Sequence, residues 1–264
     1  MQDTARIIAE AYRWQRRLGN IQFETPHCHI VANPAHPDVW DSNHADGVTA
    51  QTRDQIDAVF AAMDRHLAHT DWRVVHTDGF TPDAFLARLA LEGYGERPLT
   101  IQLVLDGDLT DRGPPIRLHP VESQADWDAL LQLAIADHTE GRRTGDLQLS
   151  HAVSAGLVAG YRAKNHACQY HLVMQDGAPT AYGACAAAPN GAGMIEDLFT
   201  LPAFRRQGIA TAMIAAFVDR LRRKGCHTLF LGALADEAPK ALYSRLGFRA
   251  VGLARTWVRL SRRP

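Results

Sequence analysis

Residues 194–210, MIEDLFTLPAFRRQGIA, are the stretch that decides the expected fold. The stretch reads as a strand over residues 194–200, a turn at Leu201-Pro202, and the start of a long helix predicted over residues 206–224. Ile209, Met213, Phe217 and Leu221 recur every four residues and form the apolar face of that helix. The pattern indicates a strand–loop–helix unit whose helix packs on a sheet.

The junction between this strand and this helix has the properties of an anion site. The first N–H groups of a helix lack intrahelical partners and lie at the positive end of the helix dipole, so they attract phosphate. Gly208 lets a phosphate approach the backbone, Ala210 keeps the first turn narrow, and Arg205 and Arg206 add positive charge. Many helices begin at a glycine, so this junction alone does not define a family.

Further elements alternate along the chain on both sides of this stretch. The C-terminal half predicts strands at 116–120, 170–174, 180–187, 228–231, 248–251 and 255–260, and helices near 127–135, at 150–164 and from a cap at Asp236 to Gly247. The N-terminal half predicts helices at 4–18, from a Thr52–Gln55 capping box, and from Thr81-Pro82, with strands from His27, at 72–75 and at 99–105. Strands that alternate with helices indicate an α/β (α+β) fold with a mixed central sheet.

The length of 264 residues favours two domains. Residues 106–115 contain two glycines and two prolines, so we place the boundary there and expect domains of 1–110 and 111–264. The order strand, helix, Gly-aromatic, strand occurs over residues 72–105 and again over 228–260. That order suggests two copies of one fold, and chance similarity between amphipathic helices remains the alternative.

Composition restricts the classes of partner. Lys plus Arg total 28 and Asp plus Glu total 29, so the net charge of −1 gives no reason to expect a nucleic acid or an anionic membrane. The four cysteines form no CxxC pair, which favours reduced thiols and a cytoplasmic location. No signal peptide or long apolar stretch is visible. His27, Cys28, His29, His36 and His44 match no standard zinc spacing, so we expect no metal.

Two motifs together resemble the GNAT N-acetyltransferase family. Its R/Q-x-x-G-x-G/A motif matches Arg205-Arg206-Gln207-Gly208-Ile209-Ala210. About 40 residues later, its helix with a Tyr followed by L-G-F matches residues 242–248, LYSRLGF. The resemblance covers roughly residues 116–260 and implies a GNAT fold there. Residues 1–110, which lack the phosphate motif, would be a degenerate GNAT-like or accessory domain.

The resemblance implies acetyl-CoA as cosubstrate. The pantetheine arm would lie in a gap between the fourth and fifth strands and bind their backbone as an added strand does. The N–H groups of residues 206–211 would hold the pyrophosphate. The implied cofactor-binding residues are Leu198, Phe199, Thr200, Arg205, Arg206, Gln207, Gly208, Ile209, Ala210, Thr211 and Lys240.

The resemblance also implies two catalytic side chains. An amine of pKa near 10 is protonated at neutral pH and needs a base before it can attack. Tyr243 would be the acid that protonates the leaving thiolate. Glu196 would be the base, by similarity to the Glu-Asp pair of spermidine/spermine acetyltransferases, with Asp197 second and facing the opposite side of the strand. A packed Tyr243 and a solvated Glu196 are the structural alternatives.

The predicted activity is transfer of an acetyl group from acetyl-CoA to a primary amine by direct attack on the thioester. The acceptor, a small-molecule or peptide amine, and the oligomeric state stay open. One alternative is a non-catalytic CoA-binding sensor or structural protein on the same fold. Another is a transferase for a different acyl or aminoacyl group.

Overall fold

The computed structural model describes residues 2–140, 149–236 and 238–261, and the chain divides into two compact units. The C-terminal unit comprises residues 1–11 and 101–251, and the N-terminal unit comprises residues 12–100 and 252–264. The boundary expected at 106–115 is therefore wrong in detail, because both chain ends belong to the unit formed by the other half. Residues 106–113 lie along the surface of the C-terminal unit and contact it: Thr110 donates a hydrogen bond to the Arg245 carbonyl, and Gly113 lies against Gly208 and Ala212.

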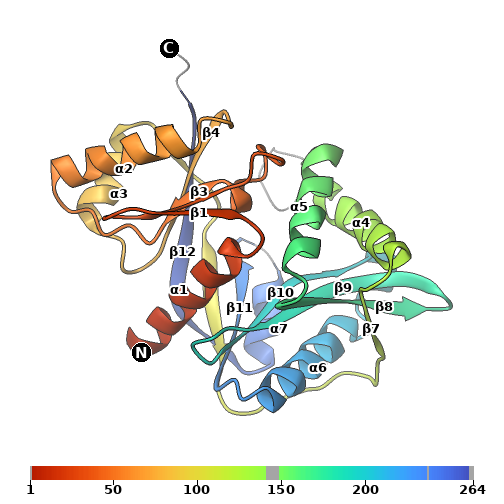
Figure 1. The fold of residues 1–264 in the computed structure, drawn as a ribbon. Helices are drawn as coiled ribbons and strands as arrows, with labels where there is room; N and C mark the ends of the chain where they lie inside the picture. The colour runs from red at the N-terminus through yellow and green to blue at the C-terminus, as the bar shows by residue number, and fades with distance from the viewer. Residues whose placement is uncertain (1, 141–148, 237, 262–264) are drawn as a thin grey trace. The chain divides into compact units, whose positions relative to one another are not determined.

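The C-terminal unit is a mixed sheet with helices on both faces. The strand order is β12-β6-β11-β10-β9-β8-β7. Strands β10 and β11 are parallel, and the pairs β7–β8, β8–β9 and β9–β10 are antiparallel. Helices α4 and α5 cover one face of β8–β10, and α6 covers the other (Figure 1). Its elements are β6 (Thr100–Leu105), β7 (Leu118–Pro120), α4 (Gln124–Thr139), α5 (His151–Lys164), β8 (Cys168–Gln175), β9 (Ala178–Ala187), β10 (Ala192–Thr200), the 3₁₀ turn η2 (Pro202–Phe204), α6 (Ile209–Arg223), β11 (Thr228–Leu234) and α7 (Pro239–Arg245).

The N-terminal unit contains a second mixed sheet of order β1-β2-β3-β4-β12, with β5 also paired to β12. Only β3 and β4 are parallel among its described pairs. Its elements are β1 (Ile21–Glu24), β2 (His29–Ala32), the 3₁₀ turn η1 (Trp40–Ser42), β3 (His44–Asp46), α2 (Arg53–His66), β4 (Trp72–Thr77), α3 (Asp83–Leu91) and β5 (Gly95–Glu96). Helix α1 (Gln2–Arg17) and strand β12 (Phe248–Leu260) contribute residues to both units.

Most predicted elements form where the sequence places them, and local chemistry explains their ends. The Thr52–Gln55 capping box starts α2, and Ser123 and Ser150 cap α4 and α5. The expected cap at Asp236 is wrong, because α7 begins after Ala238 with Pro239 in its first turn and has no side-chain cap. The two strands expected over residues 248–260 are one continuous strand, β12.

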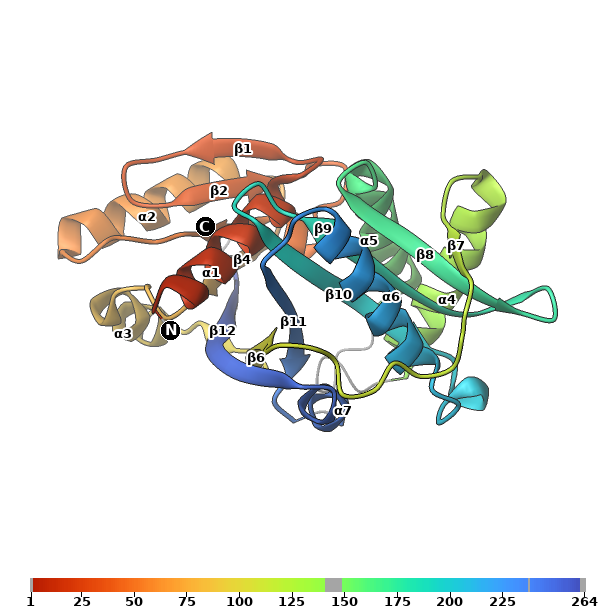
Figure 2. The same ribbon diagram turned by 90° about the horizontal axis from the view of Figure 1, so that it is seen from below.

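Helix α6 supplies most of the core of the C-terminal unit. Ile209, Met213, Phe217 and Leu221 are all buried, as their spacing predicts, and they pack against β9, β10 and β11. Gly183 and Gly193 bring the sheet close to this helix, since a Cβ at either position would lie within 3 Å of a core side chain. The end of β10 and the start of α6 are therefore fixed by a packed core. Figure 2 shows α6 lying along β9 and β10.

The repeat suggested by the sequence has matching local structure in both copies. Strand β4, helix α3, Gly93 and buried Tyr94 correspond in order to β11, α7, Gly247 and buried Phe248. Both glycines have positive φ, 76° and 101°, which lets the chain turn tightly after each helix. A common origin for the two halves stays a prediction.

A buried polar cluster joins β2, β3 and β4 in the N-terminal unit. Asp46 lies 3.4 Å from a His29 ring nitrogen, 3.6 Å from a His44 ring nitrogen and 3.6 Å from the Arg17 guanidinium. Burial alone would raise the pKa of Asp46, but His29, His44 and Arg16 outweigh burial and hold the pKa well below its usual range. Asp46 is therefore the buried carboxylate that Arg17, His29 and His44 share, and Glu24 is a second, more exposed carboxylate beside Arg17 and His29.

We expect Asp46→Asn to destabilise the protein by about 2 kcal/mol at neutral pH, because it removes the buried charge that Arg17, His29 and His44 face. A carboxylate with a lowered pKa stabilises the fold above its unfolded pKa, near 4, and loses that contribution as pH falls through the folded pKa. Wild type should thus lose more stability than the variant below about pH 4. Denaturant unfolding at several pH values measures both effects, with exposed Asp54→Asn as the control. Equal stability of wild type and Asp46→Asn at pH 7 would contradict the role of Asp46.

Thiols, apolar helices and metal-ligating groups each bear on the partners of the protein. Cys28, Cys168, Cys185 and Cys226 are all buried free thiols. In the described parts of the chain, no helix is both long and apolar enough to span a bilayer. The same residues contain no group of three or more His, Cys, Asp or Glu side chains arranged to hold a metal ion.

Candidate functional site

Strands β10 and β11 separate where the sequence resemblance places a gap. Their pairing runs from Ala192–Thr228 to Ile195–Leu231, whereas β10 continues to Thr200 and β11 to Leu234. On its other side, β10 pairs with β9 to the end but shifts register between Glu196 and Phe199. One extra residue in β10 forms a β-bulge there, and Asp197 adopts a positive φ of 55°. The bulge turns the end of β10 away from β11 and leaves one edge of its backbone unpaired by β11.

The loop after β10 leads directly to the first N–H groups of α6. Arg206 and Gly208 both have left-handed backbone angles, with φ of 65° and 79°, and Gly208 is the N-cap of α6. The Gly208 carbonyl accepts the first helical hydrogen bond, from Ala212, so the N–H groups before Ala212 have no helical acceptor. A Cβ on Gly208 would lie 2.6 Å from Pro114 Cδ, so only glycine fits at this position. This geometry suits an anion bound at the helix N-terminus.

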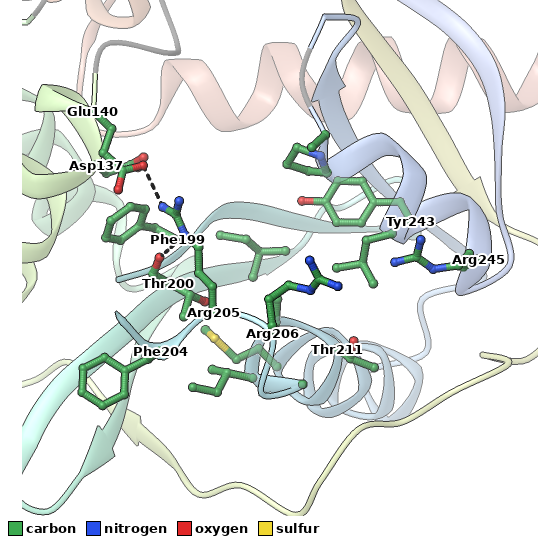
Figure 3. A pocket seen from close by; sticks show the side chains of 18 of the residues that line it. Asp137, Glu140, Phe199, Thr200, Phe204, Arg205, Arg206, Thr211, Tyr243 and Arg245 are labelled. Carbon is green, nitrogen blue, oxygen red and sulfur yellow. Dashed lines mark hydrogen bonds and ion pairs between the residues drawn. The ribbon is translucent and has the colours of Figure 1, made fainter. Parts of the chain in front are cut away.

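One cleft of about 900 Å³ connects the end of β10, the start of α6 and helix α7. Figure 3 shows Tyr243 on one side of the cleft and Asp137, Glu140, Phe199 and Thr200 on the other. Ten of the residues expected to bind the cofactor or to catalyse the reaction line the cleft: Leu198, Phe199, Thr200, Arg205, Arg206, Gly208, Ile209, Ala210, Thr211 and Tyr243. Two distant motifs of the sequence therefore meet at one cavity.

Three of the expected site residues lie elsewhere among the described residues. Gln207, Lys240 and Glu196 are absent from the lining of the cleft. The Lys240 ammonium donates a hydrogen bond to the Ala235 carbonyl, at the turn before α7. Its structural contact is thus with the protein backbone, and its expected contact with the cofactor stays a prediction.

Arg205 joins the loop to the opposite wall of the cleft. Its guanidinium forms an ion pair with Glu140 on α4 at 2.7 Å, donates to the Thr200 carbonyl at 2.9 Å, and lies over the Phe199 ring (Figure 3). Because Nε and a terminal nitrogen of one guanidinium bind these two partners, Arg205 ties the C-cap of α4 to the end of β10. The sequence predicts a cofactor contact for Arg205, and its bonds within the protein add a positioning role.

Tyr243 has both a packing contact and access to the cleft. It is 7% exposed, its ring lies 6.4 Å from the Phe248 ring, and it also lines the cleft. Its hydroxyl end is directed over the cavity in Figure 3. The phenol hydroxyl of Tyr243 can therefore donate a proton to a group held inside the cleft.

Glu196 and Asp197 do not simply alternate across the strand, because the bulge interrupts the pleat. Glu196 pairs with Ala184, which pairs with Tyr170, so Glu196 points to the face covered by α4 and α5. The Tyr170 hydroxyl donates to Asp197 at 2.7 Å. Burial and the Asp197 charge raise the pKa of Tyr170 well above its ordinary value, so the phenol stays a donor to Asp197. The expectation that the two acids face opposite sides is therefore wrong.

The cleft also contains two carboxylates that the sequence reasoning missed, Asp137 and Glu140. Asp137 is 6% exposed, lines the cleft, and accepts a 2.9 Å hydrogen bond from the hydroxyl of buried Tyr182. The signal was present in the sequence, because Asp137 continues the buried face of α4 after Leu130 and Ala134. A carboxylate on the apolar face of a helix is rare unless it has a partner or a function.

Comparisons with known proteins agree with this geometry. Residues 127–248 match the model of the acetyltransferase (GNAT) family. No curated protein matches the chain significantly. Among solved structures, a GCN5-related N-acetyltransferase from Kribbella flavida aligns with TM-score 0.69 and 19% identity over 96% of this chain and 95% of that one. A functionally unknown conserved protein from Staphylococcus epidermidis aligns with TM-score 0.68 and 14% identity over 92% and 94%.

A third solved structure is a tandem GNAT protein from the clavulanic acid biosynthesis pathway. It aligns with TM-score 0.57 and 14% identity over 84% of this chain and 76% of that one. At these identities the likeness concerns the fold alone. The expected mixed sheet flanked by helices, in a two-domain arrangement, is confirmed.

Proposed function

The chain belongs to the acetyltransferase (GNAT) family through residues 127–248, and from this premise we propose that it transfers an acetyl group from acetyl-CoA to a primary amine. The observation that carries the proposal is the meeting of the α6 N-terminus and Tyr243 at one cleft beside the separated ends of β10 and β11. The N-terminus of α6 suits a phosphate anion, and Tyr243 supplies an acid. The separated ends of β10 and β11 leave strand backbone available to hydrogen-bond an extended ligand.

Acetyl-CoA is the donor that these residues suit. The N–H groups of residues 206–211 would bind its pyrophosphate, and Arg206 would add positive charge at the mouth of the cleft. The backbone of Leu198 and Thr200 would hold the pantetheine arm. The Thr200 carbonyl already accepts from Arg205, so the arm would share that acceptor or use the neighbouring groups of β10.

The reaction on this surface needs an acid and a base. Tyr243 would protonate the thiolate as the carbon–sulfur bond breaks. The amine must lose a proton before attack, and Glu196, on the α4 and α5 face of the sheet, is the base that the sequence predicts. The free cysteines and the near-neutral charge fit a cytoplasmic enzyme whose acceptor is a small-molecule or peptide amine.

A panel of primary amines, assayed for release of free thiol from acetyl-CoA, tests this function. We expect release that depends on the amine, together with formation of the acetylated amine by mass spectrometry. The alternative function, a CoA-binding sensor on the same fold, predicts tight CoA binding without thiol release across the panel. Release with another acyl-CoA but not with acetyl-CoA would overturn the choice of donor.

We also expect one acetyl-CoA to bind per chain. The R-x-x-G-x-A motif at residues 205–210 leads into helix α6, and the matching repeat at residues 72–105 lacks this motif. Titration calorimetry measures the number of sites directly. A stoichiometry of two would show that the N-terminal unit also binds CoA and that its description as degenerate is wrong.

A further inference from the structure

We propose that Asp137 holds the acceptor amine and takes its proton, which makes the acceptor an amine that is cationic at neutral pH. The inference rests on the proposed function. It differs from the sequence-based hypothesis, which gives the base to Glu196. Asp137 lines the same cleft as Tyr243, whereas Glu196 does not.

The position of Asp137 suits a group that contacts the acceptor. Its hydrogen-bond donor, Tyr182, pairs with Phe199 in the sheet, so both rings lie on the α4 face beyond the bulge. Asp137 therefore lies above the part of β10 that has separated from β11. This is the part where the donor's arm is expected, and Figure 3 shows Asp137 beside Phe199 at this end of the cleft.

Among the described residues, the cleft is lined by three carboxylates, Asp137, Glu140 and Asp236. Asp236 lies before α7 and is exposed, whereas Asp137 is buried. Glu140, one turn further along α4, is paired with Arg205 at 2.7 Å and serves to hold the loop. Tyr182 is fully buried and donates to Oδ2 of Asp137, which fixes the orientation of that carboxylate. A fixed, buried carboxylate in a cleft attracts an ammonium group and is oriented to receive its proton.

The two substrates, Asp137, Tyr243 and water account for every proton and electron pair in the reaction. The ammonium group gives one proton to Asp137 and becomes a neutral amine. The nitrogen lone pair forms the new carbon–nitrogen bond, and the carbon–sulfur bond breaks with its electron pair on sulfur. Tyr243 protonates the sulfur and recovers a proton from the nitrogen of the adduct through solvent. Asp137 finally releases its proton to water.

Asp137→Asn tests the proposal, with the best amine from the panel as the probe. We expect kcat at pH 7 to fall about 10²-fold and to recover as pH rises toward the amine pKa near 10, because more amine is then already neutral. Binding of acetyl-CoA should not change. Asp128→Asn, which changes an exposed residue on the same helix, is the matched control and should behave as wild type.

Two further variants make the test decisive. Tyr182→Phe keeps the ring but releases the Asp137 carboxylate, so kcat should fall about 10-fold with acetyl-CoA binding unchanged, even if Asp137→Asn does not fold. Turnover of Asp137→Asn or Tyr182→Phe near that of wild type would overturn the proposal, as would a pH-recoverable loss in Glu196→Gln alone. A wild-type protein that binds acetyl-CoA but acetylates no amine overturns the proposed function instead.

Discussion

Tyr243→Phe should lower kcat about 10²-fold while the dissociation constant for acetyl-CoA stays near the wild-type value. The substitution keeps the ring, which packs near Phe248, and removes the hydroxyl that is directed over the cleft. A thiolate that leaves without a proton donor is a poorer leaving group, so the chemical step slows. Steady-state kinetics of thiol release and calorimetric binding of acetyl-CoA measure the two quantities separately.

Tyr161→Phe is the matched control for this prediction. Tyr161 is as buried as Tyr243, 7% exposed in both cases, but it stacks on Tyr170 and is not among the residues lining the cleft. Loss of its hydroxyl should leave kcat unchanged. If Tyr243→Phe also turns over like wild type, then Tyr243 packs under the helix and has no part in the chemistry.

Gly208→Val should weaken acetyl-CoA binding at least tenfold, about 1.4 kcal/mol. Two effects of the side chain act on the anion site. The residue must keep a φ of 79°, which a β-branched residue adopts only with strain, and its Cβ would lie 2.6 Å from Pro114. A backbone shift that relieves the strained φ or the clash with Pro114 would move the N–H groups at the start of α6 away from the pyrophosphate. Calorimetry with CoA gives the affinity, and circular dichroism checks the fold.

Gly225→Val separates the strain from the binding effect. Gly225 follows the last turn of the same helix and also has a positive φ, 83°, but a Cβ there would have no atom within 4 Å. This variant should lose stability through backbone strain and keep its affinity for CoA. Equal affinities of wild type and a folded Gly208→Val would remove the support that this loop gives to the proposed CoA site.

The fold was largely predictable because its main signals are local. The capping box at Thr52, the four-residue spacing along α6 and the glycine after α7 each act within one or two turns of chain. The motifs at residues 205–210 and 242–248 identified two parts of one cleft. These predictions depended on short-range chemistry, which a single sequence contains.

The features that were missed depend on contacts between distant residues. The bulge at Asp197 follows from how β9 and β10 pair, and no residue near Glu196 marks it in the sequence. The passage of β12 into the N-terminal unit follows from its pairing with β4, about 180 residues earlier in the chain. Asp137 was overlooked because its role depends on Tyr182, which lies on another element.

A crystal structure with bound acetyl-CoA tests the central claim most directly. The account predicts one molecule per chain, with its pyrophosphate against the N–H groups of residues 206–211 and its thioester in the cleft between Tyr243 and Asp137. The affinity of Gly208→Val for CoA is a supporting measurement, but the position of acetyl-CoA in the crystal structure is the decisive test. Acetyl-CoA bound away from this cleft, or no binding at concentrations that saturate an acetyltransferase, would contradict the account.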